Sequence, residues 1–314
     1  MRLIRYLDDL NLSETGCVAT IGNFDGLHLG HQAILEHVKE QAKTYNVPSC
    51  VIIFEPQPRE YLDPKTAPIR LTSLREKLEL LKAKKIDIVL CLSFNKRLKQ
   101  LSAKDFIKQI LVDGLHVKHI EIGDDFQFGA QRMGNFNMLQ QAGREFNFTV
   151  DDVKSVLLDN ERVSSTRVRK ALLADDLKLV KRLLGRAFQL SGRVIEGQKL
   201  ARKLGCPTAN IQLQRYRAPL KGVFVVSCEI ANKIYCGVAN IGIRPTVEGD
   251  GRSHLEVHLL DFNGDLYKHH IRVTFHQKLR DEIKFNSLEE LTAAINNDVT
   301  NARAYWQARG LLNH

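Results

Sequence analysis

The stretch Cys17–His31, CVATIGNFDGLHLGH, decides how the first half of the chain folds. Its five leading residues predict a buried strand, and the amphipathic residues from His31 to Tyr45 predict a helix after a Gly-rich turn. His28 and His31 are three residues apart, so both can face the same ligand at the start of that helix. A helix N-terminus offers free N–H groups and a positive dipole end, so this junction is a candidate anion site.

Short apolar runs continue to alternate with amphipathic stretches beyond this junction. Strands are expected at Ser49–Phe54, Ile86–Phe94 and from His119 to Ile122, with helices at Leu74–Lys84 and Asp105–Leu111. Strands separated by helices predict a parallel sheet with right-handed crossovers. In such an open α/β sheet the ligand binds beyond the carboxyl ends of the strands.

The pattern changes near Leu183–Gln189. From Leu190 to Phe275 short alternating strands predict an antiparallel barrel: FQLSGRVI, GVFVVSCEI, KIYCGVANIG, HLEVHLLDF and HIRVTF. Ser287 and Glu290 predict a capping box at the start of a final helix. That helix places six apolar residues on one face, Leu288, Leu291, Ile295, Val299, Ala302 and Trp306. We therefore expect two domains, residues 1–185 and 186–314.

Composition leaves several functions open. The 314 residues carry a net charge of +10, which predicts an anionic partner, either nucleic acid or a phosphorylated small molecule. Six cysteines form no CxxC pair and no cluster with metal-ligand spacing, which favours a reducing cytoplasm. The N-terminus lacks the apolar core of a signal peptide, and no apolar run is long enough to span a membrane.

Two further segments of the first half carry polar groups suited to nucleotides. Val163–Arg169, VSSTRVR, offers hydroxyls and a guanidinium for phosphates, although Ser-Ser-Thr also commonly caps a helix. Gly123–Gly129, GDDFQFG, ends a predicted strand on the ligand side of the sheet. The plain alternative for Gly123–Gly129 is two core aromatics with an exposed acid. For the junction at His28 and His31, it is a Gly-rich turn with two surface histidines. A metal site there would need a third ligand, and none is near in sequence.

GNFDGLHLGH resembles the HxGH signature of the nucleotidylyltransferases, in the branch that adenylylates flavins, and the other two segments resemble elements of the same family. The resemblance implies catalytic contacts from His28, His31 and Arg167. It implies nucleotide binding by Gly22, Phe24, Asp25, Gly30, Ser164, Ser165 and Thr166. It implies flavin contacts from Pro56, Asp125, Phe126 and Phe128. One departure is Gln57, which stands where the family has a histidine.

In the second half, the turn from Gly192 to Gly197 leads into LGCPTAN, Leu204–Asn210, which resembles the riboflavin kinase signature. The resemblance implies nucleotide contacts from Gly197, Lys203, Thr208 and Asn210, with Thr208 and Asn210 also holding Mg²⁺. Hydroxyl and amide oxygens are suitable ligands for that ion. The plain alternative is a proline turn capped by Thr and Asn. Ala201 departs from the glycine that the family often has.

Gly237–Thr246, GVANIGIRPT, resembles a third kinase element, from which Arg244 is expected at the flavin. Glu256 matches the position of the family's catalytic glutamate, which would accept the proton of the riboflavin 5′-hydroxyl. Alternation supports a plainer role, because Leu255, Val257 and Leu259 would share the opposite face of the strand and leave Glu256 facing solvent.

Together the resemblances imply the bacterial two-domain riboflavin kinase/FMN adenylyltransferases, also called FAD synthetases. The implied fold is an N-terminal Rossmann-like parallel sheet followed by a C-terminal antiparallel barrel with a terminal helix. The implied reactions phosphorylate riboflavin to FMN and adenylylate FMN to FAD, with ATP as co-substrate and Mg²⁺ as cofactor. Two alternatives remain, a nucleotidylyltransferase with a different acceptor and a basic nucleic-acid-binding protein on an enzyme fold. We expect a cytoplasmic monomer or weak homo-oligomer, with no nucleic-acid or membrane partner.

Overall fold

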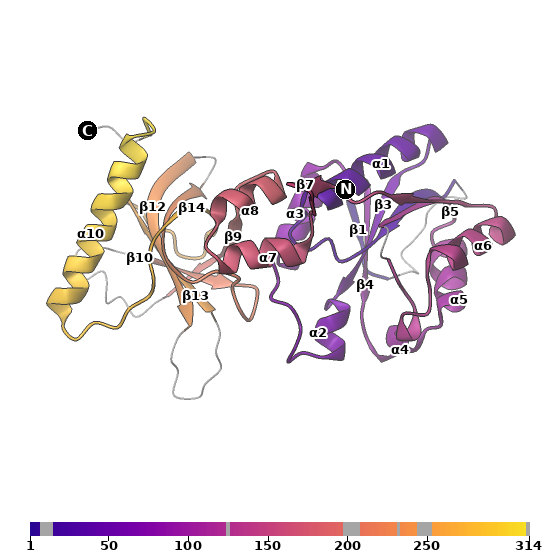
Figure 1. Cartoon of the computed structure of the whole chain (residues 1–314), viewed down its shortest axis with the longest axis horizontal. Coiled ribbons are helices and arrows are strands. Elements are labelled where there is room, and N and C mark those ends of the chain that lie inside the picture. The colour runs from indigo at the N-terminus through magenta and orange to yellow at the C-terminus, as the bar shows by residue number, and fades with distance from the viewer. Residues whose placement is uncertain (7–14, 124–125, 197–207, 231–232, 244–252, 312–314) are drawn as a thin grey trace. The chain divides into compact units, whose positions relative to one another are not determined.

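The computed structural model describes residues 1–6, 15–123, 126–196, 208–230, 233–243 and 253–311. The chain divides into two compact units, one of Met1–Pro68 and Leu74–Ser165, the other of Ile69–Ser73 and Thr166–His314 (Figure 1). Helices α7 (Ser165–Leu173) and α8 (Leu177–Leu184) thereby join the second unit. The structural division and the predicted functional boundary at 185/186 differ by these two helices.

The first unit is built on a six-stranded parallel sheet in the order β1-β4-β3-β2-β5-β6. All strands run in the same direction, but the order in which they are added reverses between β2 and β5. Such a switch point is where open α/β sheets bind ligands. The strands are β1 (Arg2–Ile4), β2 (Cys17–Ile21), β3 (Ser49–Glu55), β4 (Ile88–Ser93), β5 (Val117–Gly123) and β6 (Thr149–Val153).

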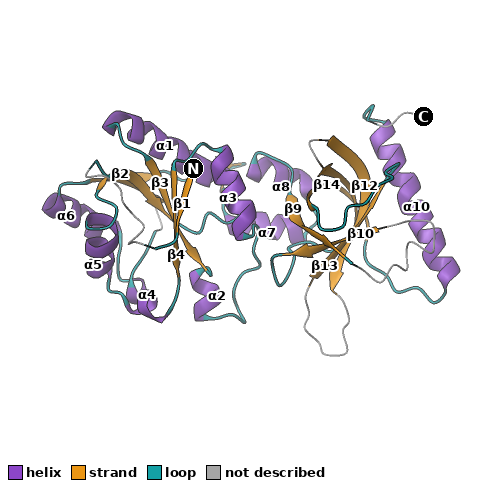
Figure 2. Ribbon diagram, turned by 180° about the vertical axis from the view of Figure 1, so that it is seen from behind, coloured by secondary structure: helices purple, strands orange, loops and turns teal. Residues whose placement is uncertain are grey.

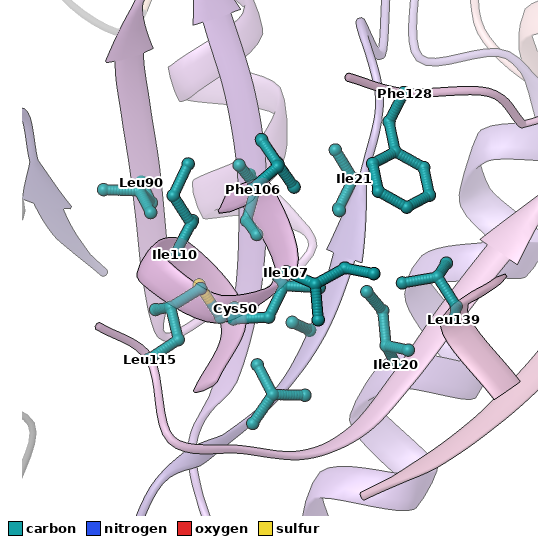
Figure 3. Close-up of a cluster of buried hydrophobic side chains, with 14 of the residues drawn as sticks. Ile21, Cys50, Leu90, Phe106, Ile107, Ile110, Leu115, Ile120, Phe128 and Leu139 are labelled. Carbon is teal, nitrogen blue, oxygen red and sulfur yellow. The ribbon is translucent and has the colours of Figure 1, made fainter. Parts of the chain in front are cut away.

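Helices cover both faces of this sheet. On one face, α1 (Leu29–Tyr45) and α3 (Leu74–Ala83) bury β-branched and leucine side chains against β2, β3 and β4. On the other, α5 (Ala103–Phe106), the wider π-turn helix η2 (Ile107–Val112) and α6 (Phe136–Phe146) close a larger core. Figure 3 shows Ile21 and Ile120 of the sheet meeting Ile107 and Leu139 of these helices. The parallel α/β prediction is confirmed.

Several predicted elements needed correction. The helix expected at Asp105–Leu111 begins earlier and changes to π-type turns at Ile107. The sequence analysis did not predict β1, β6, α6 or the short elements α2 (Pro58–Leu62), α4 (Lys96–Gln100), η3 (Ala130–Arg132), β7 (Leu157–Leu158) and β8 (Glu161–Arg162). Edge strands such as β1 and β6 contribute few buried residues, so their apolar signal is weak.

The second unit contains a closed antiparallel barrel, β10-β13-β12-β11-β14-β9, which confirms the predicted architecture (Figure 2). Its strands are β9 (Gln189–Ile195), β10 (Thr208–Leu213), β11 (Gly222–Ile230), β12 (Lys233–Ile243), β13 (Ser253–Leu259) and β14 (His270–Arg280). One of them, β10, was not predicted as a strand, because the segment that contains Thr208 and Asn210 resembles a proline turn in sequence. Closing the barrel requires β10, because it pairs with both β9 and β13.

The predicted C-terminal helix is α10 (Leu288–Gln307), and its second half packs on the barrel through Ala302 and Trp306. Ser287 caps it as predicted, accepting from the Glu290 N–H at 3.2 Å. The return bond differs from a capping box, because Glu290 accepts from the Asn286 N–H instead. Leu288, expected on the buried face, is 55% exposed. Among the described residues, no helix is long and apolar enough to cross a membrane.

Candidate active sites

The Gly-rich turn after β2 holds its shape through buried anchors. Phe24, Gly26 and Leu27 all have positive φ angles, of 46°, 81° and 43°. Phe24 and Leu27 are each 1% exposed and pack with Leu35 beneath α1. Left-handed backbone is costly for non-glycine residues and persists where surrounding packing imposes it. The Phe24 side chain therefore anchors the loop, and only its backbone is available to a nucleotide.

His28 and His31 form a stacked pair at the N-terminus of α1. Their ring centroids are 3.7 Å apart with 17° between the planes, and Phe24 lies 5.0 Å from His31. His28 caps the helix, because its Nδ1 accepts from the His31 backbone N–H at 3.3 Å. A backbone N–H can only donate, so the neutral His28 ring carries its proton on Nε2. The pair thus presents a hydrogen-bond donor at the positive end of the helix dipole.

Two predicted segments meet beside this histidine pair. Ser165 Oγ donates to the Asp25 carbonyl at 2.8 Å, which joins the SSTRVR segment to the Gly-rich turn across 140 positions. A Cβ at Gly30 would lie 3.2 Å from the His28 ring and 3.4 Å from the Val163 carbonyl. Gly30 is therefore the residue that lets these groups approach. Ser164 and Ser165 are half-buried, as is Arg167, whereas Thr166 is exposed on the first turn of α7.

The residues expected at the flavin follow the carboxyl ends of β3 and β5. Pro56 follows a cis peptide bond at the end of β3, and Gln57 caps α2 through its backbone. Gln57 is only 5% exposed, and its Nε2 has no hydrogen-bond partner among the described residues. Phe126 and Phe128 stack at 5.6 Å, with Phe128 in the core and Phe126 half-buried against it. Asp125 lies outside the described residues.

Sequence reasoning missed a group of aromatic rings at the same edge of the sheet. Phe54 is the last residue but one of β3, and its ring centroid lies 6.0 Å from that of Phe94, which follows β4. The ring of Tyr61 in α2 lies 5.7 Å from Phe94. Phe54 also lies 6.5 Å from Phe106. The available signal was position, since Phe54 and Phe94 each end an apolar run that predicts a strand. Aromatic faces at this edge suit a flat ring system.

In the barrel, three polar side chains form a row across adjacent strands. Glu256 on β13 is directly opposite Asn210 on β10 and Asn240 on β12. Directly opposed residues have Cβ atoms about 5 Å apart and share a face of the sheet. The alternation predicted for β13 is confirmed, because Leu255, Val257 and Leu259 are buried on the other face. Thr208 and His258 extend the row by one further opposed pair.

This row fits a metal-bound phosphate. Asn240 Oδ1 is buried and has no hydrogen-bond partner among the described residues, so an oxygen ligand is left available beside Glu256. Amide, hydroxyl and carboxylate oxygens together are the donor set that Mg²⁺ accepts. Asn240 and His258 were not predicted as site residues. Gly197, Lys203 and Arg244, which were predicted, lie outside the described residues.

The two constellations define a class of protein. A helix N-terminus with paired imidazoles and a barrel face with oxygen ligands both suit phosphates, so the fold and sites define a two-unit nucleotide-using transferase. Family models match both halves of the chain, "FAD synthetase" over residues 10–167 and "Riboflavin kinase" over residues 184–306.

Similar proteins agree over nearly the whole length. The bifunctional riboflavin kinase/FMN adenylyltransferase of Pseudomonas fluorescens is 58% identical, with 97% of each chain covered. That of Escherichia coli K12 is 47% identical, with 98% of each covered. A crystal structure described as a macrolide-efflux protein from Streptococcus pneumoniae has a TM-score of 0.80 at 28% identity, covering 96% of this chain and 98% of that one.

The chain belongs to the bifunctional riboflavin kinase/FMN adenylyltransferases. It phosphorylates riboflavin to FMN and adenylylates FMN to FAD, with ATP as co-substrate of both reactions. This finding sets aside both alternatives, a different acceptor and a nucleic-acid-binding role on an enzyme fold.

Proposed function

We propose that His28 and His31 bind the phosphates that react in adenylyl transfer. The observation that carries this proposal is the bond from the His31 N–H to His28 Nδ1, which leaves Nε2–H as the donor of the neutral His28 ring. The FMN phosphate attacks the α-phosphorus of ATP, its new P–O bond forms, and the bond to pyrophosphate breaks. Because this nucleophile is already an anion, the site needs no general base. Positioning and hydrogen bonds to the charged oxygens carry the rate.

Ser164 and Ser165 complete the proposed ATP site beside the histidines, and the roles of Thr166 and Arg167 toward ATP remain proposals from the resemblance. The Ser165–Asp25 hydrogen bond supports this assignment, because it fixes the helix start against the loop that bears the histidines. Gly22, Phe24, Asp25 and Gly30 contribute backbone shape and N–H groups. For the flavin we propose Pro56, Asp125, Phe126 and Phe128, with Phe54 and Phe94 added from the structure.

In the barrel we propose Glu256 as the general base of the kinase. It accepts the proton of the riboflavin 5′-hydroxyl as the oxygen forms its bond to the γ-phosphorus and ADP leaves. Such help contributes typically ~10²–10⁴-fold. Mg²⁺, held by Thr208 and Asn210, would neutralise phosphate charge when bound. Asn240 is a further candidate ligand through its unpartnered Oδ1. Gly197 and Lys203 for ATP, and Arg244 for flavin, remain proposals from the resemblance.

Paired variants test the assignment in the full-length enzyme. His31→Ala should lower FAD formation by about 10²-fold or more, with riboflavin phosphorylation unchanged, because it removes one ring of the stacked pair that we propose binds the reacting phosphates. Glu256→Gln should lower FMN formation by about 10²–10⁴-fold and leave adenylylation of supplied FMN unchanged. Flavins separated by chromatography after incubation with ATP and Mg²⁺ give both rates. A folded variant that lost both activities from one substitution would disprove the assignment of separate sites.

We further propose a functional boundary at 185/186 and a cytoplasmic location. The riboflavin kinase match begins at residue 184, which supports the boundary. Cys17, Cys50, Cys91, Cys228 and Cys236 are free and buried, which suits a reducing compartment. Burial raises the pKa of the Cys228 thiol to about 12, so it stays protonated and unreactive.

A further inference from the structure

A second polar cluster lies on the α1 face of the parallel sheet. His119 and Glu121 of β5 are each 2% exposed, and both lie inside the sheet between β2 and β6. Asp151, on the edge strand β6, is opposite Glu121 in register. Neither β5 residue has a part in the proposed reactions. A buried His–Glu pair in a sheet needs its own explanation, because unpaired buried charge is costly.

The three side chains converge on one point. His119 Nε2 lies 3.1 Å from Glu121 Oε1 and 4.0 Å from Asp151 Oδ2. One nitrogen and two carboxylate oxygens therefore lie within 4.8 Å of one another. Ligands about 2.0–2.2 Å from a shared tetrahedral zinc ion lie about 3.3–3.6 Å apart, so the two measured separations from Nε2 would each change by about 0.5 Å or less on binding. Two carboxylates beside one imidazole also give the cluster the charge that attracts a cation.

The other ring nitrogen is held as in known metal sites. His119 Nδ1 lies 2.6 Å from Thr149 Oγ1, which in turn lies 2.8 Å from the Tyr45 hydroxyl. The Tyr45 ring stacks over His119 with centroids 5.9 Å apart. When Nδ1–H donates to Thr149, Nε2 presents a lone pair toward the Glu121 carboxylate. A cation between these two acceptors, 3.1 Å apart, would stabilise this tautomer, and metal-bound histidines typically use this arrangement; in the other tautomer Nε2–H donates to Glu121 without an ion.

Thr20 gives an independent indication. It pairs with Glu121 across β2 and β5, and it stands on the α1 face two residues beyond Val18, which packs under that helix. Thr20 is 1% exposed, and its Oγ1 is buried without a hydrogen-bond partner among the described residues. A buried hydroxyl normally has a partner, so this orphan beside Glu121 favours a bound ion with its water.

We propose that His119, Glu121 and Asp151 bind one divalent transition-metal ion of the Zn²⁺ class. Imidazole nitrogen with carboxylate oxygens suits Zn²⁺, whereas Mg²⁺ and Ca²⁺ prefer all-oxygen ligands. Asp151 is 67% exposed, so the open coordination position faces solvent and the ion has an entry path. The ion ties edge strand β6 to β5. His119 lies four residues before the end of β5 and Glu121 two, about 13 Å and about 7 Å along the strand at ~3.3 Å per residue, so the cluster lies within the sheet rather than beyond its carboxyl edge.

Zinc binding by the full-length enzyme tests the proposal. The protein is stripped with a chelator, desalted, and titrated with Zn²⁺ against a chromophoric competitor in the presence of excess Mg²⁺. Asp151→Asn should weaken one site by at least about tenfold, since even the outer partners of metal ligands contribute about 10–100-fold. Asp152→Asn is the matched control, because Asp152 is exposed on the same strand but on the opposite face. The Asp152→Asn variant should bind zinc like wild type. Zinc bound at His28 or at the cysteines would have the same affinity in all of these variants.

Thermal unfolding with and without Zn²⁺ gives a second readout. Zinc should raise the unfolding temperature of wild type and Asp152→Asn, and should not raise that of Asp151→Asn or Glu121→Gln. Because Asp151 is at the surface, its variant should fold even if Glu121→Gln does not. Equal zinc affinity in wild type and Asp151→Asn would overturn the proposal, as would an absence of binding in wild type.

Discussion

At Gly30, adding a single methyl group should affect activity without lowering stability. Its Cβ would come within 3.2 Å of the His28 ring, which is held by the His31 N–H and by stacking. Gly30→Ala should therefore displace the imidazole and lower FAD formation by about tenfold or more, since small misplacement of a reacting group is costly. Alanine is the better helix former by up to about 1 kcal/mol, so the unfolding temperature should not fall.

The kinase reaction of the same protein is the internal control for Gly30→Ala. Its rate should match wild type, because the barrel row at Glu256 is in the other unit. Initial rates of both reactions and a melting curve on one preparation give the comparison. A variant that loses FAD formation only because it melts early would show that Gly30 serves folding rather than the position of His28.

At the residue scale, the sequence predicted the polar side chains of the site but not the contacts that hold them in place. The three-residue spacing at the helix start was enough to predict that His28 and His31 lie together. The bond from Ser165 Oγ to the Asp25 carbonyl was not predictable, because it joins backbone and side chain across 140 positions. Nor was Phe24 predictable as an anchor, because its side chain enters the core only through a left-handed backbone turn.

Among the elements, α10 is attached to the barrel by a buried ion pair. Arg280 of β14 makes three hydrogen bonds of 2.8–3.1 Å to the Asp298 carboxylate, which is 5% exposed. Asp298→Ala should lower the free energy of unfolding by about 3–5 kcal/mol, because it leaves the guanidinium without its counter-charge in a half-buried site. Trp306 is the only tryptophan and lies in this interface, so its fluorescence in urea reports the change.

The same helix provides a matched control on its exposed side. Arg303 pairs with Asp261 through two hydrogen bonds, but both side chains are largely in solvent. Arg303→Ala should cost less than about 1 kcal/mol, as exposed pairs usually do. If the two alanine variants unfolded at the same urea concentration, burial would not be what distinguishes these pairs.

A histidine under α10 should make the barrel unit sensitive to acid. His276 Nε2 forms a hydrogen bond with Ser227 Oγ at 2.9 Å. Its ring lies edge-on to Trp306, with centroids 4.8 Å apart. Burial, with positive charge from Arg309 and Lys181, lowers the pKa of His276 from 6.5 to about 4. Below pH 6.5 the unfolded chain binds a proton that the folded ring resists. Stability should therefore be full above pH 6.5 and fall as the pH drops toward 4.

Urea midpoints from Trp306 fluorescence between pH 7 and pH 4.5 measure this loss. It should amount to about 1–2 kcal/mol, after allowance for the partial exposure of the ring. His276→Gln keeps a partner for Ser227 and cannot titrate, so its stability should change less with pH. An identical pH profile in the variant would assign the acid sensitivity to other groups.

The elements that the sequence missed share a physical cause. Thr208–Leu213 begins with polar residues and follows a proline, so local pattern favours a turn, yet barrel closure needs β10 between β9 and β13. The edge strand β6 has two buried residues in five, and among the described strands it pairs only with β5. Both are strands because of distant partners, whereas β2 and β3 are apolar enough to be predicted alone.

At the scale of the whole molecule, each unit encloses its own hydrophobic core. The parallel sheet buries a cluster around Ile120 and Leu139, and the barrel buries Phe224 against Phe275. Separate cores and separate phosphate sites mean that a substitution in one unit should leave the chemistry of the other intact. The net charge, by contrast, belongs to the entire chain and acts on every anionic substrate at once.

This charge predicts how salt affects the two reactions. With 46 Lys and Arg against 36 Asp and Glu, the protein attracts FMN, which is an anion, but not neutral riboflavin. Raising the ionic strength from about 0.02 M to about 0.15 M shortens the Debye length from roughly 20 Å to about 8 Å. The KM for FMN should rise by about threefold, because long-range attraction is screened. The KM for riboflavin, measured at saturating ATP, should stay within about 1.5-fold, because screening has no charge to act on. Equal shifts for both flavins would mean that salt acts on the protein itself rather than on its attraction for phosphate.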